Sequence, residues 1–307
     1  GLQWTSGNAD AINLGGTRGP VTIKNCDLDA LGDDFINLHG RRMMVEGIID
    51  SSIIKVSANQ FQVQPGDELI LFRPSNGATS GTGVVKSVTY FDSRKKSWLV
   101  EFNSAINYQF QEGDYSYNES RMSNGFSITN NRFWNGRRGG VVVRGNDGLI
   151  SGNEFKGLGG NCITTDSGLL HIEGYRLKGT LIDNNVFRDC ALSTMNTHAS
   201  IYITTPKLSG GVAVSKVNEN NTISNNTIIS YQGNAVKLEA AKSIEISNNI
   251  LKTLTTNFIY RPNYIFHLIN VNAVDITNND ASGDFRAHDG HINAVQGIYN
   301  VNDNVWP

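Results

Sequence analysis

Short stretches of alternating apolar and polar residues recur along the 307-residue chain, and each ends in Asn or Gly. The pattern apolar-x-Ile-x-x-Asn-x-apolar occurs first at residues 21–28 and again at residues 126–133. Related versions follow at residues 149–155, 181–187, 222–228, 244–250 and 274–280. Because each alternation is so short, the pattern predicts brief strands separated by tight turns rather than helices.

The spacing of these units indicates a solenoid. The second Asn of each later unit marks the repeat, and the markers are Asn131, Asn153, Asn185, Asn226, Asn249 and Asn279. Successive markers are 22, 32, 41, 23 and 30 residues apart, which fits a coil of about 22 to 23 residues with extra loops in three steps. Asn tolerates the left-handed backbone of such turns, and stacked Asn side chains form a hydrogen-bonded ladder. We therefore predict an all-β chain that forms a right-handed parallel β-helix, and a leucine-rich repeat is less favoured because its Leu-x-x-Leu-x-Leu pattern is absent.

A long gap interrupts the repeat between Cys26 and Asn131, which are 105 residues apart. Inside it, segments 61–72, 83–90 and 97–102 alternate like antiparallel strands. We predict that residues 1–42 and 122–307 form the β-helix and that residues 43–121 form an inserted small antiparallel β-barrel or sandwich domain. The insertion is expected either to wall one side of a cleft or to be purely structural.

Composition narrows the class of protein. The net charge is −2 and no run of Lys or Arg occurs, so we expect no nucleic-acid partner. No apolar stretch approaches the roughly 18 residues of a membrane span, so we expect no membrane partner. The chain opens at Gly1 without Met, and we interpret it as excised or processed. The three cysteines, Cys26, Cys162 and Cys190, form no CxxC pair, and we expect them to be small buried apolar residues.

Two acidic segments fall one coil apart. Residues 9–15 (ADAINLG) align with residues 33–39 (DDFINLH), so that Asp10 matches Asp34 with a separation of 24 residues. Neighbouring strands of a sheet lie about 4.8 Å apart, so Asp10 is expected to lie beside the doublet Asp33–Asp34. Strict alternation would turn Asp34 inward and Phe35 outward. Because a buried carboxylate is costly, we expect a turn before Phe35 to change this phase.

Three clustered carboxyl groups suggest acid–base chemistry. Like charges at this spacing raise the pKa of at least one group, which leaves a protonated acid beside an ionised carboxylate. That combination hydrolyses glycosidic bonds, so Asp10, Asp33 and Asp34 are the candidate catalytic residues. The alternative is a structural acidic turn that is capped by backbone N–H groups or holds Ca²⁺.

Further polar residues are candidates for binding the substrate. Asn37 and His39 follow the acidic doublet on the predicted outer face, and His39 is expected to bond a sugar hydroxyl or to cap a turn. Arg138 and Arg144 follow the next coil, and Glu173 lies on a later one. We predict no metal and no cofactor. The segment His288-Asp-Gly-His291 is interpreted as a structural loop, since a zinc site needs three or four ligands.

The segment Gly32-Asp33-Asp34-Phe35-Ile36-Asn37-Leu38-His39-Gly40, with an Asp one coil upstream, resembles glycoside hydrolase family one hundred and ten. The resemblance covers the first 42 residues and extends more loosely to about residue 190, including the segment 173–187. It implies an exo-acting, inverting, metal-independent α-galactosidase that removes α-1,3-linked galactose, built on a β-helix with inserted barrels. It places the catalytic carboxylates at Asp10, Asp33 and Asp34 without dividing acid from base. An inverting pair is expected to be roughly 6.5–9.5 Å apart.

Two other functions remain open. Polygalacturonases share the pattern of Asn8-Ala9-Asp10 and Asp33-Asp34, but the Gly-His-Gly and Arg-Ile-Lys motifs of that family are absent here. A β-helix of the tailspike or adhesin type would bind glycans without cleaving them. In each case the predicted partner is a carbohydrate, and a secreted or periplasmic location is expected from that substrate class. The oligomeric state is not predicted.

Overall fold

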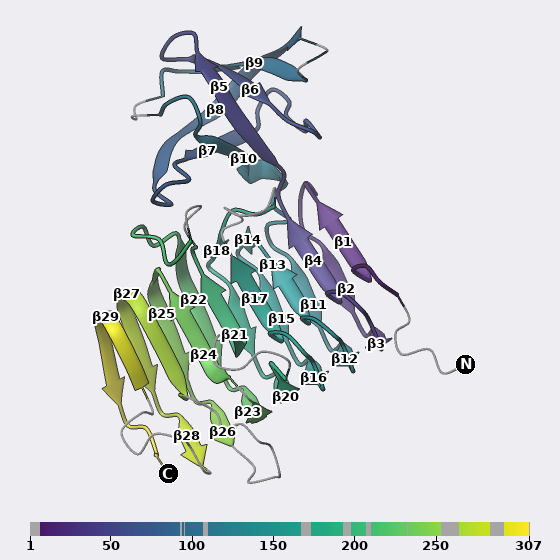
Figure 1. Ribbon diagram of the computed structural model, residues 1–307, viewed down its shortest axis with the longest axis vertical. Coiled ribbons are helices and arrows are strands. Elements are labelled where there is room, and N and C mark those ends of the chain that lie inside the picture. Colours follow the sequence, from purple (N-terminus) through teal and green to yellow (C-terminus); the bar gives the residue numbers. More distant parts are fainter. Residues whose placement is uncertain are drawn as a thin grey trace.

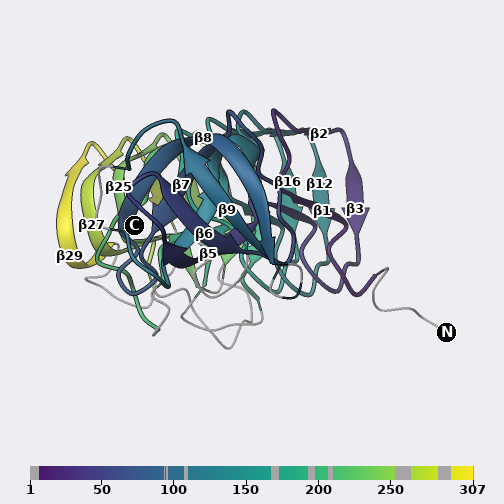
Figure 2. The same ribbon diagram turned by 90° about the horizontal axis from the view of Figure 1, so that it is seen from above.

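Three stacks of parallel strands run along the molecule, joined by tight turns (Figures 1 and 2). The computed structural model describes residues 7–92, 94, 96–106, 110–166, 173–192, 198–206, 210–231, 233–252, 264–282 and 292–306. The coils progress from β1 and β3 at one end to β29 at the other, and a separate barrel sits against one side (Figures 1 and 2). The predicted all-β class and the parallel β-helix with an antiparallel barrel are confirmed.

The first stack carries the candidate site. Its strands, in spatial order, are β1 (Ile12–Gly15), β4 (Ile36–His39), β13 (Val141–Val143), β17 (Ile163–Asp166), β21 (Ala199–Thr204), β24 (Asn234–Glu239), β27 (Phe266–Thr277) and β29 (Ile292–Asn302). The long β27 continues into the second stack, so the two stacks form one sheet.

The other two stacks close the coil. The second contains β2 (Thr22–Lys24), β11 (Ser127–Thr129), β15 (Leu149–Ser151), β19 (Leu181–Asp183), β22 (Asn218–Ser224) and β25 (Ala241–Ser247), with the short β14 (Gly145–Asn146) and β18 (Leu177–Lys178) beside it. The third contains β3 (Asp27–Asp29), β12 (Arg132–Trp134), β16 (Glu154–Lys156), β20 (Val186–Cys190), β23 (Thr227–Tyr231), β26 (Ile250–Lys252) and β28 (Asp280–Ser282).

The Asn ladder is present at the turn between the second and third stacks. In each step the Oδ1 of one Asn accepts hydrogen bonds from the backbone N–H and the side-chain Nδ2 of the preceding marker, as Asn153 does for Asn131 at 3.0 Å in both bonds. The same pair of bonds continues through Asn185, Asn226, Asn249 and Asn279 to Asn304. Each buried amide is thereby satisfied, which explains why the repeat requires Asn.

The residue before each ladder Asn makes the turn. Asn130, Asn184 and Asn248 have φ of 55°, 53° and 57°, in the left-handed region that Asn adopts more readily than most residues. Gly152 occupies the equivalent position in one coil with φ 66°. The Asn–Asn pairs of the sequence therefore combine a turn residue with a ladder residue.

The core of the β-helix comes from the inward residues of all three stacks. In the third stack, Phe133, Phe155 and Phe187 lie one above the other, with ring centroids 4.8 and 4.9 Å apart. All three rings are fully buried. The alternating pattern fixes this core because every second strand residue points inward.

The inserted domain is a closed six-stranded antiparallel barrel. Its strands are β5 (Arg42–Ile48), β6 (Ile53–Ser57), β7 (Glu68–Phe72), β8 (Thr79–Asp92), β9 (Ser97–Phe102) and β10 (Tyr115–Asn118), and the 3-10 helix η1 (Glu119–Arg121) follows. The barrel has its own apolar core. A second small core joins it to the β-helix, where Phe72 and Tyr117 pack on Tyr175 at centroid distances of 4.6 and 5.7 Å.

The expectation that all three cysteines are unpaired and buried holds only in part: Cys162 and Cys190 are buried but paired, and Cys26 is unpaired but only partly buried. Cys162 and Cys190 form a disulfide, with Cα atoms 5.8 Å apart. They are 28 residues apart in sequence, and the coil brings the start of β17 and the end of β20 to the same corner. Cys26 is a free, partly exposed cysteine, and its backbone N–H donates to Asn131 at the first step of the ladder.

No helix in the described part of the chain has the length and apolar character to cross a membrane.

Candidate active site

The predicted register of the first coil is present in the structure. β1 pairs with β4 in parallel, with Asn13 opposite Asn37 and Ile12 opposite Ile36. The 24-residue separation read from the sequence is therefore one full coil. It brings Asp10 to Asp33 and Asp34, and one carboxylate oxygen from each of the three residues lies within 4.8 Å of the others.

A bend before β4 turns the doublet away from the core. Phe35 is fully buried in the β-helix core, so the alternation that placed it outside is wrong at this residue. The bend places Phe35 and Ile36 consecutively inward and leaves Asp33 and Asp34 half-buried. The backbone N–H of Asp34 donates to Asp33 Oδ1 at 3.1 Å, which stabilises this local geometry.

Asp34 is the most perturbed of the three carboxyl groups. Burial raises the pKa of Asp34 from 3.8 to about 6, and the neighbouring charges of Asp10 and Asp33 add to the effect, while the Gly139 N–H and Arg138 oppose it. The Gly139 N–H donates to Asp34 Oδ1 at 2.9 Å. A Cβ at Gly139 would lie only 2.8 Å from that oxygen, so glycine is needed for this close approach.

Of the other two acids, Asp33 contacts a cation and Asp10 contacts two amides. The Nη1 of Arg138 lies 3.3 Å from Asp33 Oδ1, and the Arg138 side chain is 60% exposed at the rim. Asp10 Oδ2 accepts hydrogen bonds from the side-chain amides of Asn13 at 2.8 Å and Asn37 at 3.2 Å. One backbone N–H at Asp34, one arginine at Asp33 and two amides at Asp10 thus give the three carboxyl groups different environments.

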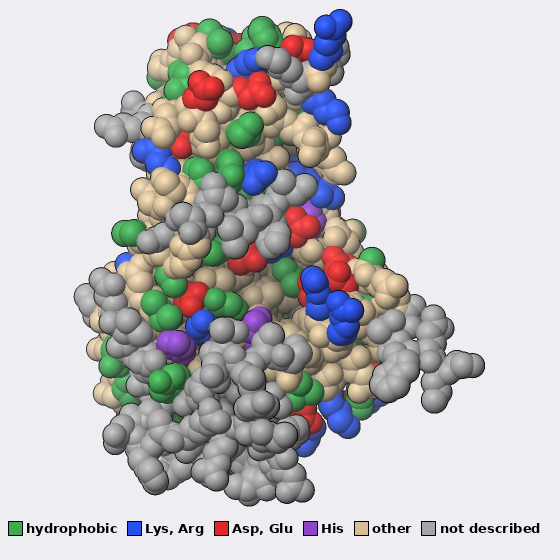
Figure 3. Space-filling model, in the orientation of Figure 1, with side chains coloured by type: hydrophobic (Ala, Val, Ile, Leu, Met, Phe, Trp, Pro, Cys, Tyr) green, Lys and Arg blue, Asp and Glu red, His purple; other side chains and the backbone are tan. Residues whose placement is uncertain are grey.

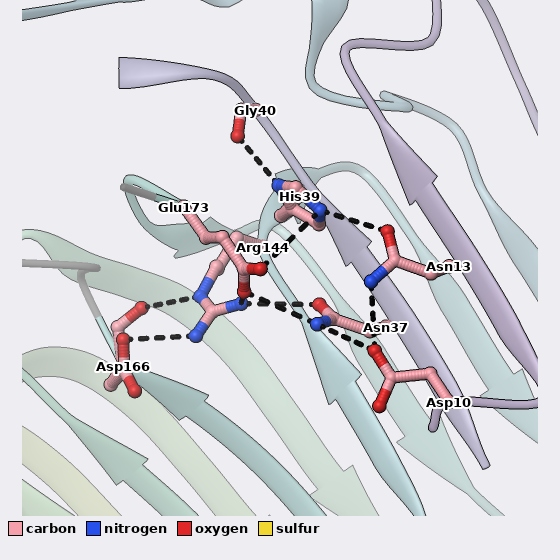
Figure 4. Close-up of polar contacts among 8 residues, drawn as sticks. All are labelled: Asp10, Asn13, Asn37, His39, Gly40, Arg144, Asp166 and Glu173. Atoms are coloured by element: carbon pink, nitrogen blue, oxygen red, sulfur yellow. Dashed lines mark hydrogen bonds and ion pairs between the residues drawn. The ribbon is translucent and has the colours of Figure 1, made fainter. Parts of the chain in front are cut away.

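Arg144 is the centre of a buried network (Figure 4). It is only 2% exposed and donates to the backbone oxygen and to Oδ1 of Asp166, both at 3.0 Å. Its Nη1 also donates to Glu173 Oε2 at 3.2 Å and to Asn37 Oδ1 at 3.3 Å. Because a buried guanidinium requires such partners, these contacts hold Glu173 and Asn37 in fixed positions.

His39 is placed differently from the prediction. Its side chain is fully buried, so it is not exposed to bond a sugar hydroxyl. Its Nδ1 donates to the Gly40 carbonyl at 2.7 Å, and its Nε2 lies 3.2 Å from Asn13 Oδ1 and 3.7 Å from Glu173 Oε1. Burial lowers the pKa of His39, opposed by the Gly40 carbonyl and Glu173. Figure 4 places it between Asn13 and Glu173, where its contacts orient both side chains.

A cleft of about 560 Å³ opens over this network. Of the eight candidate site residues, seven line it: Asp10, Asp33, Asp34, Asn37, Arg138, Arg144 and Glu173. Acidic and basic side chains lie close together on this face, below the barrel (Figure 3). None of the described residues that line the cleft comes from the barrel, so the expectation that the insertion walls this cleft is not met there.

The sequence interpretation left some cleft residues out of the candidate set. Asp166 follows Arg144 by 22 residues, which is one coil, and this spacing predicts the contact that the structure contains. His198 and Asn161 also line the cleft. No sequence pattern marked either residue; the coil that contains His198 is 38 residues long, so its position does not follow from the repeat. The segment His288–His291 lies outside the described residues.

The three clustered carboxylates are close enough to share a cation, so we tested their donor set. Ca²⁺ takes six to eight oxygen ligands. Here one oxygen of Asp34 accepts from the Gly139 N–H, one oxygen of Asp33 contacts Arg138, and one oxygen of Asp10 accepts from two amides. Donors thus already occupy one oxygen of each group, and a cation would be left with the remaining oxygens, fewer than the six to eight ligands of Ca²⁺.

Fold and sequence together define the class. Residues 100–304 match the family model described as "Right handed beta helix region", and the chain belongs to this family. The chain is also 25% identical over 285 residues to Alpha-1,3-galactosidase A of Bacteroides thetaiotaomicron, which covers 89% of this chain and 48% of the relative. The chain thus spans about half the length of that relative. The resemblance to an α-1,3-galactosidase-like β-helix is confirmed by this match.

Two solved structures align along almost the whole chain. One is the Gp54 tailspike of Acinetobacter baumannii bacteriophage AP22 in complex with A. baumannii capsular saccharide, at 12% identity and a TM-score of 0.48, covering 98% of this chain and 52% of that one. The other is the tailspike protein gp49 from Pseudomonas phage LKA1, at 10% identity and a TM-score of 0.28, covering 98% and 72%.

Proposed function

We propose that this chain is a glycoside hydrolase that removes terminal α-linked galactose from glycans. One observation carries the proposal: a carboxyl group with a pKa of about 6 lies within 4.8 Å of two others on the wall of a cleft. The sugar is inferred from the α-1,3-galactosidase relative. The exo mode of action and the specific linkage are part of the same proposal.

Asp34 is the proposed general acid. Its raised pKa keeps a large share of the group protonated at mildly acidic pH, and a general acid works best when its pKa lies near the working pH. The proton would pass to the glycosidic oxygen as the bond to the sugar breaks. Asp10 and Asp33 favour the protonated form of Asp34 by their negative charges.

Glu173 is the proposed base. The three aspartates lie too close together to form an inverting pair among themselves, since such a pair leaves room for a water at roughly 6.5–9.5 Å. Glu173 lines the same cleft and accepts a hydrogen bond from Asn37 Nδ2, which also donates to Asp10 Oδ2, so Glu173 lies beside the three aspartates and outside their cluster. The Arg144 guanidinium, 3.2 Å from Glu173, favours the ionised form that activates water.

Other cleft residues position the substrate in this proposal. Asn37 Nδ2 lies 3.2 Å from oxygens of both Asp10 and Glu173, so it spaces these two carboxylates at the floor of the cleft. Arg138 at the rim is placed to donate to sugar hydroxyl groups. Arg144 is buried and orients Glu173, so we assign it a positioning role.

We also propose that the chain acts outside the cytosol. The Cys162–Cys190 disulfide supports this location, because disulfides persist in oxidising compartments.

The test measures hydrolysis of an aryl α-galactoside and of polygalacturonate, with NMR of the first-formed anomer. We expect turnover of the galactoside with inversion, and a rate that falls as pH rises above about 6, where Asp34 loses its proton. Asp34→Asn and Glu173→Gln should each lower kcat by about 100-fold or more and retain sugar binding. Asp280→Asn, an exposed acid on β28, is the control and should behave as wild type.

Three results would contradict the proposal. Retention of configuration would exclude Glu173 as the base for water. Hydrolysis of polygalacturonate in place of the galactoside would support the pectin-hydrolase alternative. Glycan binding without turnover in wild type would support a binding protein.

A further inference from the structure

A second cavity, separate from the cleft, lies at the base of the barrel. It has a volume of about 450 Å³ and is lined by four cations, Arg41, Arg42, Arg94 and Lys96. Asn59 and Gln60 add amide groups, and no acidic residue is among the described residues that line it. A pocket with only positive charge concentrates anions, so its chemistry differs from that of the acidic cleft.

The cations of this cavity are arranged by neighbouring groups other than carboxylates. Arg42 lies over the Tyr115 ring, with its Cζ 4.3 Å from the centroid, which orients the guanidinium without neutralising it. Arg41 lies across Gly15, where a Cβ would collide with the guanidinium. The Arg41 Nε is buried and has no hydrogen-bond partner. This nitrogen is sealed against Gly15, so the guanidinium is held in place by packing and is not neutralised by a carboxylate among the described residues that line the cavity.

The cavity is connected to the cleft through the chain itself. Arg41 lies two residues after His39, the last residue of β4. It forms an isolated antiparallel β-bridge with Glu173. Glu173 lines the cleft, whereas Arg41 lines the basic cavity. A saccharide that occupies the cleft therefore has a neighbouring cationic surface on the barrel side.

We propose that the basic cavity binds an anionic group, a carboxylate or a sulfate ester, on the saccharide that the cleft acts on. The inference rests on the proposed function and specifies its substrate class as an acidic glycan. The planar guanidinium groups of Arg41 and Arg42 match the two-oxygen face of either anion. Arg94 and Lys96 are exposed at the β8–β9 hairpin and add attraction at the entrance.

The experiment measures binding on the Asp34→Asn chain, so that the saccharide is not consumed, by calorimetry at low and raised salt. The probes are a sulfated galacto-oligosaccharide, an oligogalacturonate, a neutral galacto-oligosaccharide and inorganic sulfate. Arg94→Gln/Lys96→Gln removes two exposed charges of the cavity. Lys24→Gln/Lys252→Gln removes two exposed charges on β2 and β26 and is the matched control.

We expect at least one acidic oligosaccharide to bind tenfold or more tightly than the neutral one, and to weaken with salt. Arg94→Gln/Lys96→Gln should reduce that affinity about tenfold, because two exposed ion contacts together contribute about that much. The control variant Lys24→Gln/Lys252→Gln should bind with the affinity of the parent chain. Which acidic probe binds identifies the anion. Equal affinity for neutral and acidic probes, an unaffected Arg94/Lys96 variant, or inorganic sulfate binding as tightly as the oligosaccharides would overturn the inference. Failure of the proposed function is judged separately, by turnover of the wild-type chain on a neutral aryl galactoside.

Discussion

Replacing Asp34 by Asn is expected to stabilise the fold at neutral pH while it abolishes the proposed acid. Asp34 is half-buried beside two other carboxylates, and burial is the largest cause of its raised pKa. Asn keeps an oxygen that accepts the 2.9 Å hydrogen bond from the Gly139 N–H. The substitution therefore removes a costly charge and preserves the main contact.

The sign and size follow from the two pKa values. The folded chain binds the Asp34 proton about a hundredfold more tightly than a carboxyl at 3.8, since its pKa is about 6. Below pH 3.8 the group is protonated in both states and its ionisation costs nothing. Between pH 3.8 and about 6 the unfolded state loses this proton while the folded state keeps it, so the free energy of unfolding falls across that window by about 3 kcal/mol and stays lower at higher pH. Asp34→Asn should recover most of that amount at pH 8 and little at pH 4.

The assay is urea unfolding of wild type and Asp34→Asn at pH 4, 6 and 8, followed by far-UV circular dichroism. The quantity of interest is the difference between the two chains, because it cancels every other group that titrates in this range. Asp280→Asn, at an exposed position, provides the baseline for losing one carboxylate. A difference that is the same at pH 4 and pH 8, or one that favours wild type at pH 8, would refute the reasoning.

Three further predictions concern the Asn ladder, the Arg144 network and the disulfide. Asn185→Ala removes hydrogen bonds to both ladder neighbours and to the Ile150 carbonyl, so it should lower the free energy of unfolding by about 3–5 kcal/mol. Asn304→Ala, at the end of the ladder, should lower it by less. Urea unfolding of the two variants measures the difference. Arg144→Lys should reduce kcat at least tenfold and change the pH profile of kcat, because one ammonium group cannot hold Asp166, Glu173 and Asn37 together. A variant that binds the substrate and has an unchanged kcat would contradict this prediction. Cys162→Ser/Cys190→Ser should lower the free energy of unfolding by about 3 kcal/mol, because the disulfide joins residues 28 apart in the sequence. A reducing agent should destabilise wild type by a similar amount and leave the variant unchanged.

The repeat by itself determines the architecture of the β-helix. Alternating strand residues and Asn–Asn turns specify one coil locally, and stacking repeats that specification at every level. The ladder from Asn131 to Asn279 and the pairing of Asn13 with Asn37 both follow from residue spacing alone. Spacing of one coil also accounts for the meeting of Asp10 with Asp33 and Asp34, and for that of Arg144 with Asp166.

Tertiary structure alone decided which side chains face which environment. The bend that buries Phe35, the burial of His39 beside Glu173 and the Cys162–Cys190 disulfide are features that the repeat pattern does not specify. The basic cavity at Arg41 exists only because the barrel brings β5, the segment after β6 and the β8–β9 hairpin together. Strand stacking is a local rule that the sequence repeats many times, whereas the position of a loop or an inserted barrel depends on packing between segments that no repeat relates.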